Sequence, residues 1–192
     1  MRHLSIALAA ALLLTVFVCS SQASTTSDQG ANATSHVWLT VNPTIGVQAV
    51  TGSVNLGTLK TGEIYAPVTF RIDANTQFVN LSAIVTNLYK GDDGSSPYSI
   101  PVVVTKDVAV SPGNGHATNP HADVLAYVTH GQVSTPNGSF MGHTTEVVTF
   151  ESSENGHYSM DVDLTPTWNN ADAELPRGEY SGFVTLFSSI VL

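Results

Sequence analysis

The chain ends in a stretch that is typical of an apolar β-strand: Glu179-Tyr180-Ser181-Gly182-Phe183-Val184-Thr185-Leu186-Phe187-Ser188-Ser189-Ile190-Val191-Leu192. A second such stretch follows a polar leader near the other end: Val37-Trp38-Leu39-Thr40-Val41-Asn42-Pro43. Chain ends usually fray unless another segment holds them, and an apolar strand with a free edge tends to pair with another chain. The two stretches together predict a subunit that polymerises by lending a strand to its neighbour.

The first residues are typical of a signal peptide. A short basic start is followed by an apolar run over 4–18 and by small residues at a signal-peptidase site, which places cleavage before Ser24. The run is too short to remain as a membrane anchor. Cys19 leaves a lipid-anchored form open, although the preceding valine is bulkier than such sites prefer. The leader 24–35 is rich in small polar residues, and we expect it to be flexible until it is docked.

Charge and cysteine content narrow the class of protein. The chain has a formal net charge of −9, which argues against nucleic acid and anionic lipid as partners. Its one cysteine leaves with the signal peptide, so no disulfide can hold the fold together. A secreted domain of this size must then be held by its hydrophobic core or by its neighbours.

Between the two ends the apolar residues repeat with a period of two, which predicts strands with one core face. We expect one such face to carry Tyr158, Met160, Val162 and Leu164. Two further core faces are expected at these positions: Ile64, Ala66, Val68, Phe70 and Ile72, and Val124, Ala126 and Val128. Further strands are expected at 77–88, 100–104 and 145–150, with turns rich in Gly, Pro and Asn between them. The pattern predicts an all-β sandwich of roughly seven or eight strands.

Two motifs resemble those of a known family. Leu39-Thr40-Val41-Asn42-Pro43-Thr44-Ile45 resembles the N-terminal donor strand of chaperone–usher fimbrial subunits, with Asn42 where that family has aspartate. Gly178-Glu179-Tyr180-Ser181-Gly182-Phe183-Val184-Thr185-Leu186 resembles the motif that ends the same subunits. The alternate (class 5) group, with the colonisation-factor and cable pilins, is the nearest. The archaic spore-coat-U-like pilins, which end similarly, are the second choice.

The resemblance implies an incomplete immunoglobulin-like β-sandwich that a strand from a neighbouring subunit completes. It divides the chain into a signal peptide (1–23), a leader and donor strand (24–43) and a pilin domain (44–192). The donor residues implied by the motif are Val37, Leu39, Val41 and Pro43. The residues implied at the edge of the acceptor groove are Tyr180, Val184, Leu186 and Ile190.

The family also implies partners and a location. Its subunits pass through the periplasm on a chaperone, are assembled at an outer-membrane usher, and form a homopolymer that can carry a tip adhesin. Strand addition of this kind uses main-chain hydrogen bonds for affinity and alternate side chains for specificity. A single domain with a donor-like strand predicts the major shaft subunit of an adhesive fimbria at the cell surface.

Catalytic and metal chemistry have little support in the sequence. No nucleophile elbow, zinc-protease motif or phosphate loop is present, so we expect no enzyme and no cofactor. Five histidines lie within one region: His116, His121, His130, His143 and His157. Their spacing does not predict converging ligands, so we expect solvated loop histidines and no metal site.

One alternative function stays open, a monomeric secreted β-sandwich that binds a ligand such as a carbohydrate. Modules of that kind usually present a row of exposed aromatic side chains. The two tryptophans, Trp38 and Trp168, are far apart in the sequence and predict no such platform.

Overall fold

A computed structural model describes residues 34–118 and 123–191. The expected signal peptide and most of the expected leader lie outside the described residues. The described chain is all-β, as predicted: it contains sixteen strands and no helix, and therefore no helix long and apolar enough to cross a membrane. It divides at Val41 into two units, of which 34–41 contains no strand and 42–191 contains every one. The two are described separately below.

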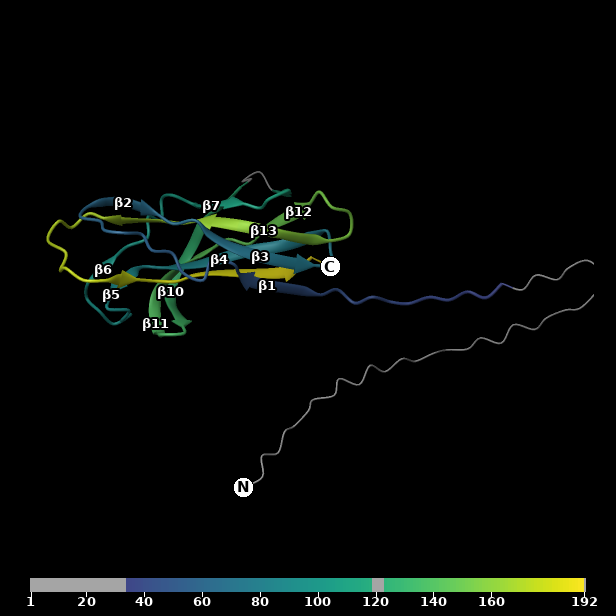
Figure 1. Ribbon diagram of the computed structural model, residues 1–192, viewed down its shortest axis with the longest axis horizontal. Helices are drawn as coiled ribbons and strands as arrows, with labels where there is room; N and C mark the ends of the chain where they lie inside the picture. The colour runs from purple at the N-terminus through teal and green to yellow at the C-terminus, as the bar shows by residue number, and fades with distance from the viewer. Residues whose placement is uncertain (1–33, 119–122, 192) are drawn as a thin grey trace, which may run out of the picture. The chain divides into compact units, whose positions relative to one another are not determined.

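The first large sheet has the strand order β1-β3-β13-β7-β9, with every pair antiparallel. Its strands are β1 (Ile45–Ala49), β3 (Val68–Ala74), β13 (Tyr158–Thr165), β7 (Val108–Ser111) and β9 (Val124–Leu125). Figure 1 shows β3 and β13 at its centre, with β1 at one edge.

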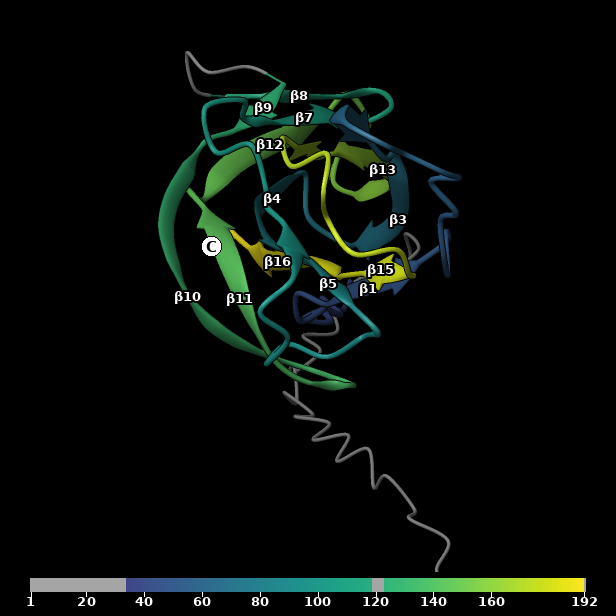
Figure 2. The same cartoon turned by 90° about the vertical axis from the view of Figure 1, so that its left-hand side faces the viewer.

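The second large sheet is built on β4 (Phe78–Thr86). One edge of β4 pairs with β16 (Val184–Ile190) from Val79 to Val85. The other edge pairs with two strands in turn, β11 (Gly138–Thr145) and β12 (Val148–Ser152). Beyond these lie β10 (Tyr127–Thr135), paired with β11, and β8 (Gly115–Ala117), paired with β12. Figure 2 shows how strongly the β10–β11 hairpin curls.

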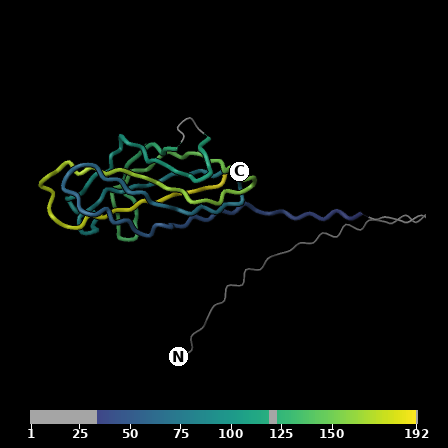
Figure 3. Tube along the Cα trace, turned by 45° about the horizontal axis from the view of Figure 1, so that its top comes forward, coloured from purple at the N-terminus to yellow at the C-terminus, as the bar shows by residue number. Residues whose placement is uncertain are grey.

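Two small sheets close one end of this body. One pairs β14 (Thr167–Asn170) with β2 (Gly62–Tyr65), and the other has the order β15-β5-β6. The strands of the latter are β15 (Tyr180–Ser181), β5 (Leu88–Lys90) and β6 (Ser99–Ile100). In Figure 3 the C-terminal segment, in yellow, leaves the loop at this end and runs lengthwise back through the body.

The core is one hydrophobic cluster to which both large sheets contribute. The alternation predicted for β13 is confirmed, because Tyr158, Met160, Val162 and Leu164 are all buried. The core face predicted over 64–72 is also confirmed, because Ala66, Phe70 and Ile72 are buried and Ile64 and Val68 pack against the core. The strand itself is divided into β2 and β3 at Pro67, since proline cannot donate a ladder hydrogen bond. Breaks of this kind explain why the chain has more and shorter strands than predicted.

One predicted core face is wrong. Val124, Ala126 and Val128 were expected to point inward, but Leu125 is the fully buried residue and Val128 is 58% exposed. Residue 126 separates β9 from β10, and a β-bulge follows between Tyr127 and Thr129. An extra residue in a strand reverses which side chains face the core, so a simple period of two cannot hold here.

Thr145 completes the edge of β4 at the point where its partner changes from β11 to β12. The Ala83 backbone N–H donates to Thr145 Oγ1 at 2.8 Å, and both residues are buried. A side-chain oxygen therefore replaces the missing strand carbonyl as the hydrogen-bond acceptor. A buried N–H needs such an acceptor, because an unpaired buried N–H costs free energy.

Replacing Thr145 by the isosteric valine removes that acceptor and leaves the Ala83 N–H unpaired. We expect Thr145→Val to lower the free energy of unfolding by about 1–3 kcal/mol, measured as a lower urea midpoint. The matched control is Thr144→Val, whose hydroxyl makes no hydrogen bond within the described residues. Equal midpoints for the two variants would contradict the role given to Thr145.

Candidate functional site

A groove of about 1070 Å³ opens in the unit formed by residues 42–191. One wall is formed by the end of β1 and the segment after it, residues 49–59, and the other is the segment 178–184 that contains β15 and the start of β16. The floor comes from β2, β3, β5, β6 and β14. The groove therefore lies between the segment that follows β1 and the segment that leads into β16.

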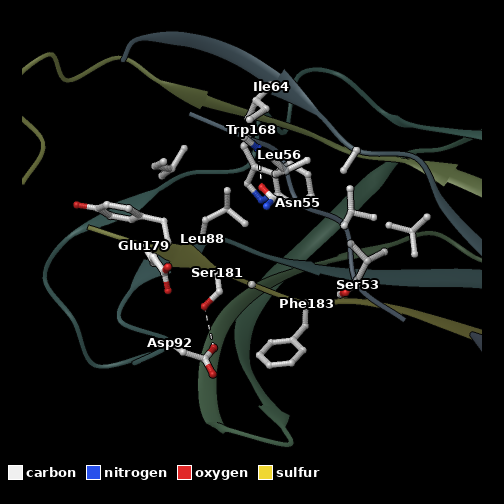
Figure 4. Close-up of a pocket in the computed structure, with 18 of the residues that line it drawn as sticks. Ser53, Asn55, Leu56, Ile64, Leu88, Asp92, Trp168, Glu179, Ser181 and Phe183 are labelled. Atoms are coloured by element: carbon white, nitrogen blue, oxygen red, sulfur yellow. Dashed lines mark hydrogen bonds between the residues drawn. The ribbon is translucent and has the colours of Figure 1, made fainter. Parts of the chain in front are cut away.

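The floor of the groove is apolar and held in place. Trp168 is 2% exposed, and its Nε1–H donates to the Thr86 carbonyl oxygen at 2.8 Å. Figure 4 shows Ile64 and Leu56 beside Trp168 and Leu88 across from them. A rigid apolar floor of this kind suits apolar side chains and offers little to a charged ligand.

One polar cluster stands at the rim. Ser181 Oγ donates to Asp92 Oδ1 at 2.8 Å, drawn as a dashed line in Figure 4, and Asn137 Nδ2 donates to Asp92 Oδ2. Asp92 has a φ of 56°, a left-handed conformation that aspartate tolerates better than most residues. One carboxylate thus joins the turn after β5, the tip of the β10–β11 hairpin and β15.

Glycine is required at the bend between β15 and β16. A Cβ on Gly182 would lie 2.6 Å from the Asn87 carbonyl oxygen and 2.8 Å from Thr86 Oγ1. The close approach lets the Phe183 N–H donate to Thr86 Oγ1 at 2.8 Å. The Gly182 of the C-terminal motif therefore has a physical reason, since no larger residue fits.

Two strand edges beside the groove are unpaired among the described residues. Among the described strands, β16 pairs only with β4, and β1 pairs only with β3. The two strands lie side by side in Figures 1 and 2, although they belong to different sheets.

The four residues expected at the groove edge are not equivalent in the structure. Tyr180 and Val184 line the groove. Leu186 is buried in the core at 7% exposure, because it points inward from β16. Ile190 is half-buried at the far end of β16, opposite Val79, and does not line the groove.

The four residues expected in the donor strand are all exposed: Val37, Leu39, Val41 and Pro43. The exposed fractions of the first three are 86%, 83% and 72%. Residues 37–43, predicted as a strand, form none here, as expected for a single strand that has no partner. The Asn75 side chain holds the chain just after them: it accepts from the Thr44 N–H at 2.6 Å and donates to the Asn42 carbonyl at 3.0 Å.

Sequence reasoning missed the wall at 49–59, the Asp92 cluster and the role of Trp168 in the floor. After Ala49, the last residue of β1, this wall contains no strand, and no periodic signal marks it. The Asp92 cluster joins residues up to 89 positions apart in the sequence. Of these three features, only Trp168 has a local sequence signal: it lies two residues after Pro166 in a stretch that resembles a strand.

The histidines also differ from expectation. His121 lies outside the described residues, and His157 lies in the loop just before β13, as expected. His116, His130 and His143 are on β8, β10 and β11, so the expectation that they are loop residues is wrong. No group of three or more His, Cys, Asp or Glu residues that could hold a metal ion occurs in the described parts of the chain.

Comparison with protein-family models, with curated proteins and with solved structures finds no match to this chain.

Tyr180 braces the second wall of the groove, since its hydroxyl donates to the Pro176 carbonyl at 2.7 Å. Tyr180→Phe removes this bond, worth about 1 kcal/mol. We expect amide hydrogen exchange over 176–181 to become about fivefold faster, measured by mass spectrometry. Tyr98→Phe, which keeps the ring beneath Lys90, is the control. Unchanged exchange in Tyr180→Phe would show that other contacts hold this wall.

Proposed function

We propose that this protein is the structural shaft subunit of an adhesive surface fimbria, and that it polymerises when residues 37–43 of one copy enter the groove of the next. One observation carries the proposal: the same chain has an exposed, alternating apolar segment and an apolar groove beside unpaired strand edges. The two features are complementary in chemistry and in backbone hydrogen bonding.

The strand order supports an incomplete immunoglobulin-like sandwich. In such folds one sheet has the order A-B-E-D and the other contains C-F-G. The order β1-β3-β13-β7 corresponds to the first, and β4-β16 corresponds to C-F. Within the described residues nothing pairs with β16 at the position of strand G. We infer that the missing strand comes from another molecule.

Burial of the donor side chains favours assembly. Val37, Leu39 and Val41 share one face of an extended strand, and each contributes about 1.5–3 kcal/mol when buried. The three together give about 5–9 kcal/mol before backbone hydrogen bonds. A head-to-tail contact of this kind does not close into a ring of two, so it generates a filament. Transfer by a periplasmic chaperone and an outer-membrane usher is part of the proposal and rests on the two terminal motifs.

The face that enters the groove can be tested with two neighbouring positions. Leu39→Asp places a charge in an apolar groove at a cost of several kcal/mol, so we expect filaments to be lost. Thr40→Asp, on the opposite face, should largely retain them. Polymer yield is measured by electron microscopy of surface appendages in cells producing each variant. Equal loss in both variants would contradict the assigned face.

Completing the fold within one chain tests the empty strand position directly. Residues 35–43 are appended after Leu192 through a flexible linker, which allows the added strand to turn back along β16. We expect a monomer with a higher melting temperature, because the added strand binds only the folded state. The control carries the Leu39→Asp change in the appended copy and should gain little.

The opposite result favours the alternative function. If the parent protein is a stable, soluble monomer and the appended strand does not raise its melting temperature, the fold was already complete. The protein would then be better described as a monomeric secreted ligand-binding module.

A further inference from the structure

Two histidines face each other across the β10–β11 hairpin. His130 and His143 are register partners, and their ring centroids are 6.0 Å apart with an angle of 34° between the rings. Side chains directly opposite on antiparallel strands lie close enough to act together. The curled hairpin that carries them forms one side of the body in Figure 2.

A β-bulge brings a third ring to the same face. Residues three apart on a regular strand point to opposite faces, but the bulge between Tyr127 and Thr129 adds one residue before His130. The Tyr127 ring consequently meets the His143 ring edge-on, with centroids 5.9 Å apart. The three rings form a continuous row on the hairpin.

The imidazoles line a shallow cavity of about 180 Å³, whose other walls include Val104, Tyr127 and Val128. Neither imidazole makes a hydrogen bond or ion pair within the described residues, whereas His116 and His157 lie beside Glu151 and Glu154. Each ring of the facing pair therefore has one unprotonated nitrogen that can accept an added ligand.

The geometry points to a binding site for a divalent transition-metal ion that prefers imidazole, Cu²⁺ or Zn²⁺, held between His130 and His143. Two imidazoles bound to one ion at about 2.0–2.1 Å and a tetrahedral angle have centroids about 5 Å apart. The observed 6.0 Å needs a closure of about 1 Å, which a small rotation of the two side chains supplies. Imidazole is a good ligand for both ions, and affinities favour Cu²⁺ over Zn²⁺.

With two protein ligands the remaining coordination positions are open to water. Structural zinc sites usually have four protein ligands, so this site is exchangeable and does not hold the fold together. A bound ion would link β10 to β11 near the bulge, where their pairing is irregular. The inference is independent of the proposed filament.

The test uses untagged full-length protein after signal removal and titrates it with ZnCl₂ and CuSO₄ by calorimetry. We expect one ion per chain at this site, and affinity reduced about tenfold or more by His130→Gln or His143→Gln. His116→Gln and His157→Gln are matched controls and should bind as the parent does. The Cu²⁺ paramagnetic resonance spectrum should show two imidazole nitrogens in the parent and one in each variant of the pair.

A second readout is thermal. ZnCl₂ should raise the melting temperature of the parent, because the ion binds only the folded hairpin, and this rise should disappear in His130→Gln. His130 is exposed, so this substitution leaves the core intact. Binding and thermal shift that survive in His130→Gln, or that fall equally in the two controls, would overturn the site.

Discussion

The pairing of β4 along both edges is the interaction on which the other strands depend. β16 covers one edge from Val79 to Val85, while β11, the Thr145 side chain and β12 cover the other. The side chains of Val79, Leu81, Ala83 and Val85 are fully buried. A strand that is paired on both sides and buried on one face cannot shift without leaving polar groups unpaired. β16 is the last strand on that side of β4 among the described residues.

Backbone pairing is less complete outside β4. β16 and β1 each keep one unpaired edge, and the groove beside them has an apolar floor around Trp168. Unpaired edges next to apolar surface favour association. The segment 37–43 carries exposed, alternating apolar side chains, which are the kind of side chain that such a groove accepts. A further strand at these two edges would add ladder hydrogen bonds and cover the apolar floor, which is the physical basis of the proposed assembly.

Regular strands were predictable from the sequence, and irregular ones were not. The alternation from Tyr158 to Leu164 identified the core face of β13 because neither a proline nor a bulge interrupts it. The same rule failed around Leu125, where a break and a bulge follow within a few residues. Two residues of the C-terminal motif, Tyr180 and Val184, lie in one wall of the groove. It could not locate the wall at 49–59, whose position depends on tertiary packing and not on local periodicity.

The candidate sites lie where regular pairing stops. Thr145 fills the gap where β4 changes partners, Gly182 permits the close approach that begins β16, and the bulge before His130 puts three rings on one face. Each of these irregularities interrupts the regular hydrogen bonding between strands. Each also changes the direction in which a nearby group points. Natural sequences tend to break local rules at functional positions. Departures from the period of two therefore mark the candidate sites of this chain, whereas the regular strands determine its core.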